Sequence, residues 1–255
     1  MVGKSTWKDR HSSDWFSGSS AGHGRNVRSG ETALGISARR TLRGMVRYFA
    51  VSTLLLALVP FQWSAKPLPK SVKSQLEQRG FWHKGCPVGL GDLRLLTVTH
   101  VGFDGGSHHG QLIVNRRATG PLSSAFRAMY RNRFPIRHMR IRDFYGPVRQ
   151  RPNDVTASFQ CRQAVPSPCS GGSGTGTWSN HAYGLAVDIN PRENPYVGCG
   201  QSNDPTAQAY RNRGRNRPGM IGGRTVRAFA DAGWGWGGSW SGDTKDYMHF
   251  SHNGH

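Results

Sequence analysis

The sequence predicts a mixed α+β domain, and three features of the chain indicate this class. Two β-rich runs separated by a Gly-rich turn are typical of an antiparallel hairpin. Two further segments carry apolar residues at helical spacing. These elements do not alternate as strand, helix and strand, which argues against a parallel sheet. With 255 residues, the chain is long enough for one ordinary domain and an additional tail.

The predicted hairpin lies between Asp92 and Val114. Residues 93–98 read LRLLTV and residues 111–114 read QLIV, and both runs are rich in the residue types that strands favour. Between them, residues 103–106 read FDGG, which predicts a turn. We therefore expect two antiparallel strands here.

Two segments are predicted to be helices. Residues 123–134 repeat their apolar side chains every three to four positions and precede the helix-breaking Pro135. Residues 225–232 show the same spacing and end before Gly233. Ser, Gly and Pro, with several arginines in the second segment, predict long loops at 167–177 and 198–219.

The N-terminal part of the chain has the composition of an export segment. Arginines precede an apolar run of about a dozen residues that ends at Pro60, which is typical of a signal peptide and short for a membrane span. We expect signal peptidase to cleave near Ser64–Ala65. If the segment is not cleaved, it would remain as a membrane anchor. We expect four parts: a disordered or untranslated extension at 1–44, the signal or anchor at 45–65, a linker at 66–79 and the folded domain at 80–255.

Charge and cysteine content restrict the class of partner and the compartment. The net charge of +20 favours an acidic partner, either nucleic acid, an anionic membrane or an anionic cell-wall polymer, although a solvated basic surface has the same composition. None of the four cysteines forms a CxxC pair, which argues against a zinc ribbon or a thioredoxin-like site. Four cysteines predict two disulfides in an exported protein.

Two short segments contain a set of metal-ligating side chains. Residues 185–189 predict a strand that ends near Asp188, and His181 precedes it across Gly184, which permits a turn of the backbone. His249 follows in the string DYMHF at 246–250. Two imidazoles and one carboxylate leave a fourth zinc position open, as in catalytic zinc sites. Asp246 requires a turn or bulge before His249 to reach the same ion.

The string SNHAYGLAVDINP, from Ser179 to Pro191, resembles the SxHxxGxAxD signature of the VanY-type zinc D-alanyl-D-alanine carboxypeptidases. WGWGGSWSGD, beginning at Trp234, and DYMHF resemble the closing metal motif of this family. SFQCR, from Ser158 to Arg162, resembles the strand that carries their substrate-site arginine. The resemblance covers about residues 80–253.

This resemblance implies a fold, a cofactor and a set of roles. The fold would be of the hedgehog/DD-peptidase type, with a central antiparallel sheet, flanking helices and long loops. Zn²⁺ would be held by His181, Asp188 and His249. Asp246 would act as the general base, where many relatives carry a longer Glu, and Arg162 would polarise the scissile carbonyl and stabilise the oxyanion.

Four residues near these motifs are expected to contact substrate: Ser158, Ser179, Tyr183 and Trp178. For the tryptophans around the motifs, packing in the core or at its rim is the competing interpretation, because Trp is more often a packing residue. The substrate implied by the resemblance is a peptidoglycan stem peptide, with anionic cell-wall polymers as further partners. We expect a monomer that binds no nucleic acid.

The same resemblance favours a Cys86–Cys161 disulfide, because relatives carry cysteines in both the GCPV and the FxCR positions. Cys169–Cys199 would then join the two Gly-rich loops. Both bonds need an oxidising compartment, so we expect a secreted or envelope-associated protein.

Three classes of function remain open from the sequence. The first is a zinc peptidase, which removes terminal D-Ala as a carboxypeptidase or cuts internally, for example at L-Ala–D-Glu. The second is a non-catalytic wall-binding module, which the intact set of ligands argues against. The third, nucleic-acid binding, has only the charge in its favour, because no recognisable nucleic-acid motif is present. Arginines in 211–217 either hold a substrate carboxylate or belong to a solvated loop.

Overall fold

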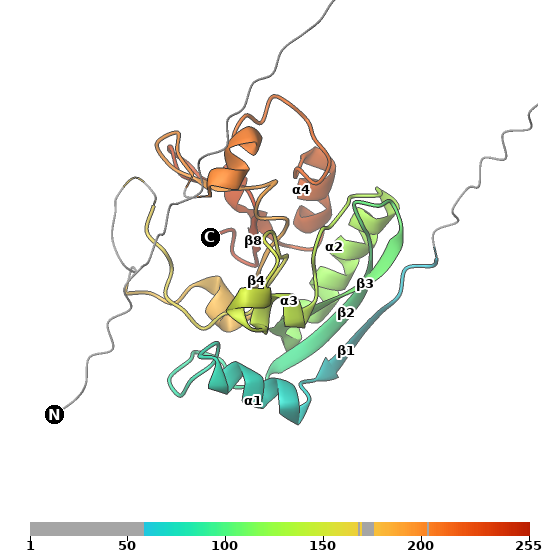
Figure 1. Ribbon diagram of the computed structural model, residues 1–255, viewed down its shortest axis with the longest axis vertical. Coiled ribbons are helices and arrows are strands. Elements are labelled where there is room, and N and C mark those ends of the chain that lie inside the picture. Colours follow the sequence, from blue (N-terminus) through green and yellow to red (C-terminus); the bar gives the residue numbers. More distant parts are fainter. Residues whose placement is uncertain (1–58, 168, 170–175, 203) are drawn as a thin grey trace, which may run out of the picture. The chain divides into compact units, whose positions relative to one another are not determined.

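A three-stranded antiparallel sheet forms the first half of the fold (Figure 1). The structure, a computed structural model, describes residues 59–167, 169, 176–202 and 204–255. Strands β1 (Trp63–Pro67), β2 (Leu93–Val101) and β3 (Ser107–Asn115) lie in this order, and Leu96 pairs with Leu112. The hairpin predicted from the sequence is therefore confirmed, with a turn at residues 102–106.

Helix α2 (Thr119–Arg131) packs on β2 of this sheet, and helix α4 (Gly223–Ala230) packs on α2. Figure 1 shows α2 and α4 next to each other. Helix α2 ends three residues before its predicted end, because Arg133 adopts a left-handed backbone with φ 54°. Helix α4 ends before Gly233, which takes φ 79°.

Short strands build the second half of the fold. Strands β4 (Ala186–Asp188), β8 (His249–Ser251) and β6 (Gly235–Trp236) form an antiparallel sheet, and β5 (Tyr196–Val197) pairs with β7 (Lys245–Asp246). The remaining short helices are α3 (Ile141–Tyr145) and the 3₁₀ segments Arg116–Ala118, Val148–Gln150, Asn180–Tyr183, Pro205–Tyr210 and Gly237–Ser239. The α+β class is thus confirmed, and the finer hedgehog/DD-peptidase assignment stays a proposal.

One hydrophobic core connects the two halves. Phe250 of β8 stacks on Phe229 of α4, with ring centroids 3.8 Å apart, and Phe126 of α2 meets Phe229 edge to face. All three side chains are at most 1% exposed. Burying each such side chain stabilises the fold by about 1.5–3 kcal/mol. Since Phe250 directly follows His249, this core holds β8 in place behind the candidate site.

The segment expected to be a linker, 66–79, differs from the prediction. It contains the end of β1 and helix α1 (Lys70–Gln78), and both Leu68 and Leu76 are buried in a second core. The packed part of the chain therefore begins before residue 80. A helix forms here because Leu76 and its apolar neighbours find a partner surface, which sequence periodicity alone does not reveal.

The predicted N-terminal segments fall mainly outside the described residues. This holds for the extension at 1–44 and for residues 45–58 of the signal or anchor. The expected exit near Ser64–Ala65 lies within β1, where Ser64 pairs with Thr97. In the described part of the chain, no helix has the length and apolar character to cross a membrane.

Both predicted disulfides are present. Cys86–Cys161 ties the segment after α1 to the strand-like segment around Phe159, with a Cα–Cα distance of 5.8 Å. Cys169–Cys199 joins the two long loops, with a Cα–Cα distance of 5.5 Å. The two bonds therefore fasten segments that carry little regular secondary structure.

Candidate metal centre and cleft

A short turn of 3₁₀ helix positions His181. The Ser179 hydroxyl accepts a hydrogen bond from the His181 N–H at 3.3 Å and caps this turn. Gly184 ends it with φ 67°, and a Cβ there would lie 2.6 Å from the Asn115 nitrogen. Only glycine combines this left-handed backbone with so close an approach to β3. The predicted turn at Gly184 is thus confirmed, and it directs the chain from His181 into β4.

Asp188 and His249 are direct partners across two antiparallel strands. Asp188 of β4 pairs with His249 of β8 in the register of the sheet. Residues 247 and 248 form a turn between β7 and β8, as the spacing of Asp246 and His249 required. The two metal motifs, separated by about sixty residues of sequence, therefore meet through backbone pairing.

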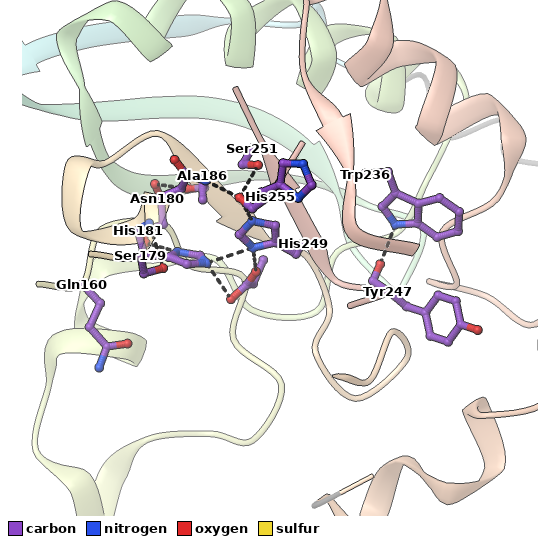
Figure 2. Close-up of polar contacts among 12 residues, drawn as sticks. Gln160, Ser179, Asn180, His181, Ala186, Trp236, Tyr247, His249, Ser251 and His255 are labelled. Atoms are coloured by element: carbon purple, nitrogen blue, oxygen red, sulfur yellow. Dashed lines mark hydrogen bonds and ion pairs between the residues drawn. The ribbon is translucent and has the colours of Figure 1, made fainter. Parts of the chain in front are cut away.

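Potential ligand atoms of three residues converge at the centre of this arrangement. His181 Nε2 lies 3.1 Å from His249 Nδ1 and 3.2 Å from Asp188 Oδ2, and His249 Nδ1 lies 3.1 Å from Asp188 Oδ1. Figure 2 shows the rings of His181 and His249 directed toward each other. Ligands about 2.0–2.1 Å from a tetrahedral zinc ion lie about 3.3 Å apart, so this spacing fits zinc.

The other nitrogen of each imidazole ring indicates which tautomer the neutral histidine adopts. His181 Nδ1 lies 2.6 Å from the Ser158 carbonyl oxygen, and His249 Nε2 lies 3.2 Å from the His255 carbonyl oxygen. Each of these nitrogens must carry a proton to donate to its carbonyl. Without a cation, a proton shared with Asp188 offsets the repulsion at this point: burial acts to lower the pKa of His249, but Asp188 raises it above its ordinary value. In the neutral tautomers that bind a metal, His181 Nε2 and His249 Nδ1 direct their lone pairs toward the point that the Asp188 carboxylate also faces. Such a set of acceptors suits a cation, and carbonyls that orient metal-binding histidines are common in metal sites.

The charge on Asp188 is consistent with this arrangement. Burial acts to raise the pKa of Asp188, but His181 and His249 hold that pKa well below its ordinary value. The carboxylate is therefore ionised at neutral pH. A second group of potential ligands in the described chain consists of His83, Cys86 and Cys161. Its two cysteines form a disulfide with each other, so this group offers no thiolate to a metal.

Asp246 lies beside this set on β7 and is half-buried. Its Oδ1 atom is buried without a hydrogen-bond partner in the described part of the chain. Burial, followed by the neighbouring Asp188, raises the pKa of Asp246 to about 7. Gly237 packs against it so closely that an added Cβ would lie 2.6 Å from the Asp246 carbonyl oxygen. A carboxylate oxygen without a partner, placed next to a candidate metal site, is suited to accept a proton.

A cavity of about 620 Å³ opens over these groups. Arg162 lines it, and its Nε and Nη1 donate to Gln160 Oε1 at 3.3 Å and to the Gln163 carbonyl at 3.2 Å. The predicted Trp178, Ser179 and Tyr183 line the cavity too. The full lining consists of Arg162, Ala164, Val165, Thr177, Trp178, Ser179, Asn180, His181, Tyr183, Leu185, Tyr196, Trp240, Asp246, His249, His252, Asn253 and His255.

Ser158 was expected to contact substrate, and this prediction is wrong. Its side chain is 2% exposed and does not line the cavity, and its hydroxyl donates to the Ala186 carbonyl at 2.6 Å. The hydroxyl is therefore committed to holding β4 and is not presented to substrate. Its carbonyl orients His181 instead. The residue supports the candidate site from behind.

Sequence reasoning missed one residue that positions a cleft side chain. Gln160 accepts the hydrogen bond from Arg162 Nε, and its own N–H donates to the His181 carbonyl at 3.1 Å. The signal was present, since residues two apart in an extended segment share a face. Gln160 thus connects Arg162 to the turn that carries His181.

Comparison with known proteins identifies one family. Residues 173–252 match the family model described as D-alanyl-D-alanine carboxypeptidase. No curated protein and no solved structure matches the chain. The matched segment contains His181, Asp188, Asp246 and His249, so the resemblance read from the sequence is confirmed here. Residues 173–252 of this chain are thus related to the D-alanyl-D-alanine carboxypeptidase family.

Proposed function

We propose that this protein is a zinc-dependent peptidase that hydrolyses stem peptides of peptidoglycan, with removal of the terminal D-Ala as its reaction. The observation that carries the proposal is the convergence of His181, Asp188 and His249, with ligand atoms 3.1–3.2 Å apart, beside the unpartnered Oδ1 of Asp246. The family match over residues 173–252 supports both the metal and the substrate class.

His181, Asp188 and His249 would hold the metal. When bound, zinc supplies a Lewis acid that polarises a carbonyl and makes water acidic enough to react near neutral pH. The Ser158 and His255 carbonyls keep the two histidines in the orientation that presents their lone pairs inward. The protein groups thus prepare the ligand set before any ion arrives.

Asp246 and Arg162 have complementary parts in the reaction. Asp246 accepts the proton of the attacking water on its carboxylate and passes it to the leaving amine. In the metal-free chain, burial and Asp188 raise the pKa of Asp246 to about 7, so this carboxylate binds a proton more readily than an ordinary aspartate. Arg162 has Nη2 left after its two contacts with the protein, and it donates to the developing oxyanion or to the terminal carboxylate of the substrate.

The walls of the cleft suit a short peptide. Trp178 and Tyr183 are 38% and 36% exposed, which is unusual for large aromatic side chains, and both line the cavity. Their rings provide apolar surface for the methyl groups of alanine residues. Two disulfides support an extracytoplasmic location, where peptidoglycan lies, because such bonds persist in oxidising compartments.

The metal is tested on the full chain by measuring zinc content and the zinc-edge anomalous signal. We expect one zinc per chain, which Asp188→Ala loses. His252→Ala is the matched control, because His252 also lines the cavity but lies outside the ligand set. Loss of zinc from the His252 variant, with retention in the Asp188 variant, would refute the assignment.

The reaction is tested by mass spectrometry of peptidoglycan fragments after incubation with the zinc-loaded chain. Release of terminal D-Ala supports the carboxypeptidase. Products cut between L-Ala and D-Glu would replace it with the endopeptidase. Intact fragments in the presence of bound zinc would support the non-catalytic wall-binding module instead.

A further inference from the structure

The arginine-rich segment 211–217 does not belong to the candidate cleft. None of its residues lines the 620 Å³ cavity. Arg213 is an anchor, because it donates to the carbonyls of Glu193 and Ile221 at 3.0 and 2.8 Å and lies 4.6 Å from the Tyr247 ring centroid. The segment is therefore attached to the protein at Arg213. Arg217 lies 5.4 Å from the Tyr210 ring centroid and forms no ion pair in the described part of the chain.

Arg217, four residues after this anchor, lines a second cavity of about 730 Å³. Arg133, which follows α2, and Arg224, in the first turn of α4, line the same cavity. Helices α2 and α4 lie next to each other (Figure 1), so three segments distant in sequence bring their arginines to one hollow. The candidate cleft and this cavity share no lining residue.

The charge of this cavity is not compensated by the protein. No Asp or Glu is among its lining residues, and none of its three arginines forms an ion pair within the described part of the chain. Arg137, by contrast, is paired with the buried Asp154 and Glu193. The Gly105 carbonyl, which accepts from Arg133 at 3.2 Å, and the Tyr210 ring near Arg217 carry no net charge, so the three arginines attract an anion that enters the cavity.

We propose that this cavity binds phosphate groups of a soluble phosphodiester polymer. Arginine presents a planar fork of donors that matches phosphate oxygens. The described large hydrophobic side chains that are exposed lie elsewhere, so no apolar anchor for a lipid surface is present at the cavity. Its one aromatic lining residue, Phe134, is 9% exposed and offers little stacking surface to a nucleic-acid base. A backbone of phosphates without bases therefore fits best.

The test measures binding of a labelled poly(glycerol phosphate) oligomer to the full chain by fluorescence anisotropy over a range of salt. We expect R217Q/R224Q to weaken binding about tenfold or more and to lower the salt slope by about 2, one for each lost phosphate contact. R117Q/R149Q is the matched control, because both residues are exposed, outside this cavity and equal in charge change. The control should change affinity less than about twofold.

Several outcomes overturn the proposal: no binding by the wild-type chain, equal loss in both double variants, or tighter arginine-dependent binding to anionic vesicles or duplex DNA than to the oligomer. Hydrogen exchange of the wild-type chain provides a second measurement, with protection by the oligomer expected at residues 132–135 and 216–225. Zinc content and peptide hydrolysis should stay at the wild-type level in R217Q/R224Q. Failure of the proposed peptidase function would therefore leave this result unaffected.

Discussion

Replacement of Asp246 by Asn separates a catalytic from a structural role, because it should stabilise the metal-free protein while abolishing hydrolysis. Burial and Asp188 raise the pKa of Asp246 from 3.8 to about 7. A carboxyl whose pKa is raised by folding binds its proton more tightly in the folded state. The folded chain therefore loses stability as pH rises from about 4 to about 7, and the full cost is present above pH 7.

The magnitude follows from the pKa shift. About three pKa units correspond to about 4 kcal/mol at pH 8, which is an upper limit because the Asn amide also loses hydration when it is buried. We expect Asp246→Asn to raise the free energy of unfolding at pH 8 by about 1–4 kcal/mol and to have little effect at pH 4. Turnover with zinc bound should fall by about 10²–10⁴-fold, because the amide cannot accept the proton.

The assay compares urea unfolding with chelator at pH 4 and pH 8, together with zinc content and hydrolysis at neutral pH. Asp231→Asn, an exposed carboxylate after α4, is the control and should change neither property. Equal destabilisation of Asp246→Asn at both pH values would refute the reasoning, since the carboxylate would then make a favourable contact. Wild-type turnover with bound zinc would remove Asp246 from the role of base.

Three further predictions concern the surroundings of the site. Arg162→Lys should reduce kcat about 10²–10³-fold with zinc retained, because lysine has no planar fork of donors. A kcat near the wild-type value in steady-state kinetics would assign this arginine a structural role. Gly237→Ala should lower kcat without loss of zinc, because the added Cβ would lie 2.6 Å from the Asp246 carbonyl oxygen and would displace that backbone. Unchanged steady-state kinetics would show that the backbone relaxes without effect on catalysis. Replacing Cys169 and Cys199 by Ser should lower the free energy of unfolding by about 2–4 kcal/mol, measured by urea titration, and an unchanged midpoint would mean that the loops are held by other contacts.

Local sequence patterns were reliable where the interaction is local. The hairpin 93–115 forms as predicted, because alternating apolar residues and a Gly-rich turn specify it within one short segment. Helices α2 and α4 form within a few residues of their predicted ranges, and Gly233 ends α4 in a left-handed conformation. The two disulfides came from family resemblance, since four cysteines allow three pairings and spacing alone does not choose among them.

Other features could be identified only from the packed tertiary structure. Helix α1 was expected to be a linker, because its amphipathic side is short and is stabilised only by the core that buries Leu76. Ser158 was expected to contact substrate, yet its hydroxyl holds the Ala186 carbonyl. Gln160 was not assigned a role, although it connects Arg162 to the backbone of His181. In the first two cases a distant segment determines what the side chain contacts, and in the third a distant backbone carbonyl positions the residue.

For the site itself, the sequence alone determined the chemical inventory: two histidines, two aspartates and one arginine in motifs that resemble those of a peptidase family. Gly184 within SNHAYGLAVDINP also permitted a turn, because glycine enters the left-handed region without a steric cost, and the structure places it there with φ 67°. The tertiary structure decided how the pieces meet. Pairing of Asp188 with His249 across two strands brings ligand atoms of three residues to distances of 3.1–3.2 Å from one another's nearest atoms. Burial then leaves Asp246 with a raised pKa, because hydration and dielectric surroundings are properties of the folded chain and not of any segment.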